Sequence, residues 1–166
     1  MTEIEQILCA VTQALSGDGY SVIRAYPRSG AARWSHPVVA VSIKAGSQIS
    51  TGFGEYLGVK NDPERGALEL YGKRVELTVA ADIYSPKDMD NGAQKCAQVF
   101  AAICTAAGAL PQGIKCGGVS CQETELDGKT GMFLCRCELK LQAYLYAEDD
   151  GESGQILDFR LKGEAV

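Results

Sequence analysis

The chain has 166 residues, of which 46% are hydrophobic and 22% are charged, and its formal net charge is −5. These values are ordinary for a globular domain with a buried core, and they argue against a disordered chain and against bulk nucleic-acid binding, which needs a positive field. No stretch approaches the roughly 20 apolar residues of a membrane span, and the acidic N-terminus is unlike a signal peptide, so we expect a protein that stays where it is made and has no membrane partner.

The N-terminal part of the chain predicts one helix and two strands. Thr2 and Glu5 form a capping box, and apolar residues recur at helical spacing over residues 4–15. Residues 20–26 predict a short strand. Residues 37–44 predict a second strand with an apolar face.

Residues 46–71 show no sustained period and contain several glycines. They predict a long loop excursion with a short hairpin near residues 56–59 and 67–71. Loops of this length are uncommon in compact domains unless they are mobile or used for binding.

The middle of the chain predicts a strand followed by a helix. Over residues 73–84 apolar and polar residues alternate, which predicts one buried and one solvated face. Ser85 and Pro86 are typical of a helix start, and the apolar stripe that follows over residues 93–107 is closed by Gly108.

The last part predicts a β-hairpin with arms at residues 113–126 and 130–147, and then a C-terminal strand and tail at residues 155–166. In the second arm the apolar residues lie on one face and charged residues on the other. We therefore predict a single α+β domain over residues 1–166, with a mostly antiparallel β-sheet, two helices packed on one face and the excursion at 46–71.

Seven cysteines and no export signal favour free thiols in a reducing compartment. Cys116, Cys121, Cys135 and Cys137 fall on the arms of the predicted hairpin, so a four-thiolate zinc site is conceivable, although the spacing departs from that of short zinc knuckles. Cys135 and Cys137 are also in phase with apolar neighbours, where cysteine packs as a small apolar residue. We favour packing and expect no metal and no other cofactor.

No catalytic set is evident in the sequence. His36 is the single histidine, and nothing places a thiol beside it as a nucleophile. Gly52, Gly54 and Gly58 have the wrong spacing for a nucleotide-binding loop. We therefore expect that the protein is not an enzyme. The alternative is a small α+β enzyme or ligand-binding domain with a pocket between sheet and loop.

Charge is distributed unevenly along the chain. Between Gly19 and Gly54 the charged residues are all basic, whereas the stretch from Glu148 onward is rich in acids. A solvated surface explains this pattern. Alternatively, opposite patches dock copies of the chain head to tail, which closes a ring when the rotation permits.

The order of the predicted elements resembles that of the tail terminator (tail-completion) proteins of tailed bacteriophages and prophages. Residues 72–86, GKRVELTVAADIYSP, look like the strand and helix entry of these small morphogenesis proteins, and residues 145–150, LYAEDD, look like the end of their long strand. A neighbouring head–tail joining family shares this likeness.

The resemblance implies a non-enzymatic subunit that forms a hexameric ring. Such a ring caps the tail tube and joins it to the head connector, so the implied partners are further copies, the tail tube protein and the head–tail connector protein. DNA is expected only as cargo passing through the ring lumen. The implied location is the bacterial host cytoplasm during assembly and then the virion tail.

The candidate contact residues come from the basic stretch, the excursion and the acidic turn; they are Arg24, Arg28, Arg33, Trp34, Phe53, Tyr56, Leu57, Glu148, Asp149 and Asp150. Charge reversal at Arg28 and Arg33 is expected to weaken oligomerisation most strongly at low salt, because screening by salt already weakens such contacts. Mass measurements in solution across a salt series check this expectation. An unchanged mass would reject the electrostatic contact.

Overall fold

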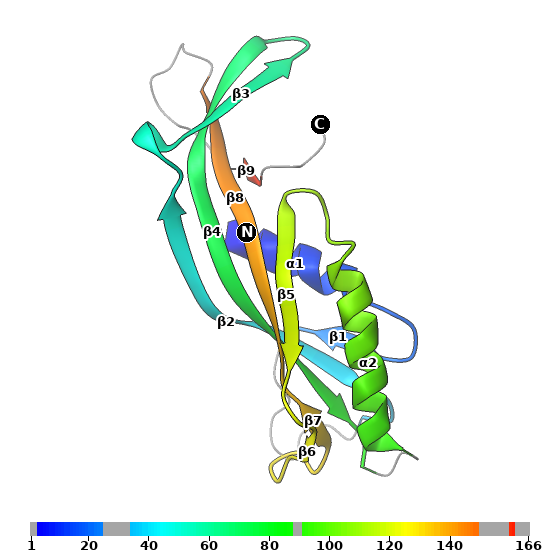
Figure 1. Cartoon of the computed structure of the whole chain (residues 1–166). Helices are drawn as coiled ribbons and strands as arrows, with labels where there is room; N and C mark the ends of the chain where they lie inside the picture. Colours follow the sequence, from blue (N-terminus) through cyan, green and yellow to red (C-terminus); the bar gives the residue numbers. More distant parts are fainter. Residues whose placement is uncertain (1–2, 25–33, 88–90, 150–159, 162–166) are drawn as a thin grey trace.

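A computed structural model describes residues 3–24, 34–87, 91–149 and 160–161 (Figure 1). The described part holds two α-helices, a short 3-10 turn and nine strands. In chain order they are α1 (Glu3–Ala14), β1 (Ser21–Ile23), β2 (Val38–Ser50), η1 (Phe53–Glu55), β3 (Tyr56–Asp62), β4 (Gly66–Ser85), α2 (Gly92–Ala107), β5 (Ile114–Cys121), β6 (Glu125–Leu126), β7 (Phe133–Cys135), β8 (Cys137–Asp149) and β9 (Arg160–Leu161).

The long strand β4 is the centre of one sheet (Figure 1). One edge of β4 pairs first with β3 and then with β2, and its other edge pairs with β8 and then with β7. Strand β5 extends the sheet beyond β8, and β6 extends it beyond β7. All of these pairings are antiparallel, and β1 adds to β2 in parallel. The predicted α+β fold with a mostly antiparallel sheet is confirmed.

Both helices pack on the same face of the sheet, because their buried side chains belong to one core cluster with those of β2, β4, β5, β7 and β8. Helix α1 packs near β2, and α2 packs against β4, β5 and β7. Ile7 and Ile103 of the helices and Val79 and Leu139 of the sheet are fully buried there. We call this side the core face and the opposite side the polar face. The predicted apolar face of the hairpin's second arm lies in this core.

Residues 46–71 are more regular than predicted. Strand β2 continues to Ser50, because residues 46–50 pair with β4 in register even though their side chains lack an apolar alternation. The predicted hairpin is present as β3 and the start of β4. Tyr56 pairs with Tyr71 at its open end, and Asp62 pairs with Gly66 next to the turn. At its turn the Asp62 carboxylate accepts hydrogen bonds from the backbone N–H groups of Glu64 and Arg65, at 2.9 and 3.0 Å.

Helix α2 does not begin at Ser85, as predicted, but at Gly92. Ser85 is fully buried and is still part of β4, where it pairs with Phe133. Pairing with β7 therefore extends the strand beyond the local helix signal. The predicted solvated face of β4 is also dry at this end, since Tyr84 packs with Ala40, Met132 and Leu134 in a second small apolar cluster.

Candidate assembly surfaces

The polar face of the sheet is the surface opposite the helices. A hollow of about 440 Å³ lies over it. Half of its lining residues are polar or charged, and the other half are glycine, alanine or leucine; they are Ser47, Glu76, Thr78, Lys140 and Gln142, and Ala45, Gly46, Leu77, Gly117 and Leu141. The Gln142 Nε2 donates a hydrogen bond to Glu76 Oε1 at 3.1 Å, which ties β8 to β4 across this face. The hollow is open to solvent and has both polar and apolar lining, so its lining alone does not select one class of partner.

Charged side chains on the polar face pair with one another. Lys44 of β2 forms an ion pair with Glu138 of β8, and Arg74 Nη2 lies 3.2 Å from Glu76 Oε1 within β4. These groups are at least partly exposed, so each pair contributes little to stability. Their pattern of charge matters more for specificity, because a partner surface must carry complementary charges to bind this face.

Several stretches of sheet edge have no strand beside them within the described residues, and two of them carry few charges. One is the outer edge of β2 at residues 45–50, past the point where β1 ends, and the other is the outer edge of β5. Residues 45–50 contain no charged residue and no proline, and Lys115 is the sole charge in β5. Proteins commonly protect exposed edges with charges or prolines, because unpaired backbone groups recruit another strand. These two edges have little such protection.

Of the candidates from the basic stretch, Arg24 and Trp34 are described, and they lie towards the end of the sheet where β4 finishes. Arg24 is exposed and follows β1 directly. Trp34 is half-buried and packs edge-on against Tyr84, with ring centroids 6.4 Å apart, so it belongs to the second apolar cluster. Arg28 and Arg33 lie outside the described residues.

The described candidates from the excursion and the acidic turn lie at the opposite end of β4. Tyr56 is 43% exposed and packs against Tyr71 with ring centroids 5.5 Å apart, and Leu57 beside it is half-buried. Phe53 is part of η1, and its side chain lies outside the described part of the structure. The backbones of Glu148 and Asp149 pair with Leu70 and Glu69, and Asp150 lies outside the described residues.

The structure therefore divides the candidates into two groups on one long strand. Tyr71, which Tyr56 contacts, and Tyr84, which Trp34 contacts, are both residues of β4. At about 3.3 Å per residue, the two groups are roughly 40 Å apart. They do not form a single site.

His36 does not take part in a catalytic set within the described residues. Its Nε2 lies 2.7 Å from Ser21 Oγ, and both residues are exposed. No carboxylate of the described residues is bonded to the other ring nitrogen, so the third group that orients a serine–histidine pair is absent there. The contact ties β1 to the entry of β2.

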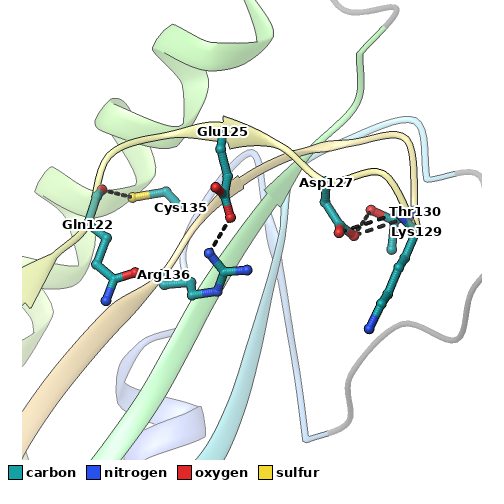
Figure 2. A network of polar contacts seen from close by, with 7 residues as sticks. All are labelled: Gln122, Glu125, Asp127, Lys129, Thr130, Cys135 and Arg136. Carbon is teal, nitrogen blue, oxygen red and sulfur yellow. Dashed lines mark hydrogen bonds and ion pairs between the residues drawn. The ribbon is translucent and has the colours of Figure 1, made fainter.

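The hairpin of β6 and β7 carries a small polar network (Figure 2). Arg136 forms an ion pair with Glu125, and Asp127 closes the turn by accepting hydrogen bonds from the backbone N–H and the hydroxyl of Thr130, at 3.1 and 2.6 Å. The Thr130 hydroxyl, together with the Lys129 and Thr130 N–H groups, holds the pKa of Asp127 below its usual range.

Replacing Asp127 with alanine is expected to destabilise the protein by about 1 kcal/mol, the usual net contribution of such hydrogen bonds. Because the folded-state pKa is lowered, this contribution is present above the unfolded-state value and is lost as the pH falls through the folded-state value. Urea unfolding at neutral and acidic pH measures it. A loss of stability that is the same at both pH values would contradict the assignment.

Among the described residues, no group of three or more histidine, cysteine, aspartate or glutamate side chains is placed to hold a metal ion, so the four-thiolate arrangement is not formed there. No described helix combines the length and the apolar character needed to cross a membrane. Neither a protein-family model nor a curated protein matches the chain.

Proposed function

We propose that this protein is a structural subunit that associates with copies of itself, edge to edge, into a ring that caps a phage tail tube and joins it to the head connector. The observation that carries the proposal is the pair of weakly protected edges at opposite sides of one sheet. The tail tube and the connector enter through the resemblance in element order to tail terminators. The host cytoplasm during assembly and the virion tail afterwards are part of the same proposal.

Strand direction favours this association. Strand β2 is antiparallel to β4, β4 to β8, and β8 to β5, so β2 and β5 run in opposite directions. If two copies continue one sheet, the β2 edge of one copy meets the β5 edge of the next as an antiparallel pair, which is the more stable pairing. Such a contact uses different surfaces on each copy. It closes into a ring if the rotation between copies divides a full turn.

The mass of the protein in solution tests the proposal. We expect a defined oligomer by light scattering and native mass spectrometry, and rings by electron microscopy. The double variant Gln48→Lys, Ser120→Lys places a charge on each edge at exposed positions, and it is expected to be monomeric while its circular dichroism spectrum stays that of the wild type. Gln98→Lys, on the exposed face of α2, is the matched control and should assemble normally.

Two results would reject edge pairing, namely a wild-type protein that is monomeric at every concentration or an edge variant that assembles like the control. A monomer that binds a small molecule in the hollow of the polar face would favour the ligand-binding alternative. The phage role is tested separately by adding the ring to purified tail tubes. Tubes capped at one end support the role, and rings that do not bind the tubes contradict it.

A further inference from the structure

Three cysteine thiols lie together where β5, β7 and β8 meet. Cys135 Sγ and Cys137 Sγ are 3.8 Å apart, and both residues are buried. Cys121, at the end of β5, is directly opposite Cys137 in the sheet register and is exposed. The group therefore has one thiol that reagents in solution can reach and two thiols behind it.

The backbone hydrogen bonds identify the kind of pair that Cys121 and Cys137 form. The Gln122 N–H donates to the Arg136 carbonyl at 2.9 Å, one residue beyond the pair on each strand. In an antiparallel ladder this makes Cys121 and Cys137 a non-hydrogen-bonded pair, whose Cα atoms are about 4.5 Å apart. Disulfides span Cα distances of about 4.4 to 6.8 Å, so this pair can be bridged without moving the strands.

We propose that Cys121 and Cys137 are a thiol–disulfide exchange site that closes a reversible cross-strand disulfide with a small-molecule disulfide as the oxidant. The Cys121 thiolate attacks one sulfur of the oxidant and expels the first thiolate, leaving a mixed disulfide. The Cys137 thiolate then attacks Cys121 Sγ and expels the second. Two protein thiols are oxidised, one small disulfide is reduced to two thiols, and the two protons pass to the expelled thiolates.

The surroundings of the thiols determine how fast the disulfide forms and which thiol reacts first. Partial desolvation raises the pKa of the exposed Cys121 thiol, with the nearby Cys135 and Cys104 thiols adding to the effect, and burial raises the pKa of Cys137. Few thiolates are present at neutral pH, so exchange is slow there and faster in mildly alkaline solution. Cys121 reacts first because it is the exposed member. The closed disulfide would fix the β5 edge strand to β8, independently of the ring proposed above.

Oxidised glutathione added to the full-length protein at mildly alkaline pH tests the site. After blocking of the remaining thiols, peptide mapping should show one intramolecular link between Cys121 and Cys137, reversed by excess reduced glutathione. The melting temperature should rise by roughly 5 to 10 °C, as expected for a loop of about 15 residues. Cys9→Ser, in α1 and outside the group, is the control and should behave like the wild type.

Variants separate the two steps. Cys121→Ser should lose the link, whereas Cys137→Ala should stop at the mixed disulfide on Cys121. If Cys137→Ala fails to fold, the peptide map of the wild-type protein still shows whether Cys121 and Cys137 are linked. A link between Cys121 and Cys135, a mixed disulfide that never resolves, or no reaction at Cys121 would each overturn the proposal.

Discussion

Replacing Gly72 with alanine is expected to lower the melting temperature by roughly 5 to 12 °C, equivalent to about 3 kcal/mol for a chain of this size. A Cβ at this position would lie 2.0 Å from the Leu145 carbonyl oxygen and 2.7 Å from the Tyr146 Cα. Both atoms belong to the backbone of β8, which pairs with β4 at this point. No side chain can rotate away, so the strands themselves must separate.

Gly118→Ala provides the matched control for this effect. Gly118 is also a strand glycine, in β5, and a Cβ there would have no heavy atom within 4 Å. Thermal unfolding of both variants at one fixed protein concentration compares them, because self-association makes the melting temperature depend on concentration. Equal melting temperatures for the two variants would contradict the close approach of β4 and β8.

Leu139→Ala is expected to destabilise the protein by about 3 kcal/mol, within the usual range for truncating a buried leucine. Leu139 is fully buried on the core face of β8 and lies opposite Val79 of β4 and Val119 of β5. Removing its side chain would leave a cavity between three strands and the helix layer. Strands in a paired sheet relax little, so the cavity is expected to persist.

Urea unfolding measures the loss, with Leu126→Ala as the comparison. Leu126 is 51% exposed in β6, so the same change there should cost less than about 1 kcal/mol. The two substitutions remove the same atoms and differ in burial. Similar costs for both would mean that the helices do not cover this face.

The regular parts of the fold could be predicted from sequence periods. The alternation in residues 73–84 and in the second hairpin arm corresponds to β4 and β8, and apolar spacing located both helices. These segments place one face in the core along most of their length, so burial leaves a clear pattern in the residues. Apolar character alone does not determine burial on α2, where Val99 is buried and Cys104 is exposed.

The errors arose where pairing with a distant strand decides the local structure. Residues 46–50 are strand because β4 offers partners, and Ser85 remains in a strand because β7 does. Neither partner is visible in the neighbouring sequence. Trp34 remains a candidate contact residue, and its packing against Tyr84 likewise follows from the fold, because these residues come together only in the folded chain.

The candidate surfaces were predictable as residue types and not as an arrangement. The uneven charge was visible in the sequence, whereas the placing of Tyr56 and Trp34 at opposite ends of β4 depends on the pairing of the strands and on packing in the fold. Unprotected edges depend on sheet order, which periodicity does not determine. The opposition of Cys121 and Cys137 likewise follows from register, although two cysteines on adjacent hairpin arms are a signal that can be tested.

The position of β4 between early and late strands has a consequence for the order of folding. Strands β2, β3 and β4 follow one another in the chain and can pair as soon as they leave the ribosome, but β8 must still be synthesised. Gln142 and Glu76, which bond across β4 and β8, are 66 residues apart. Such distant contacts slow folding. Until β8 is synthesised, the edge of β4 with which it pairs is exposed in the nascent chain. At this stage aggregation competes most strongly with completion of the native sheet.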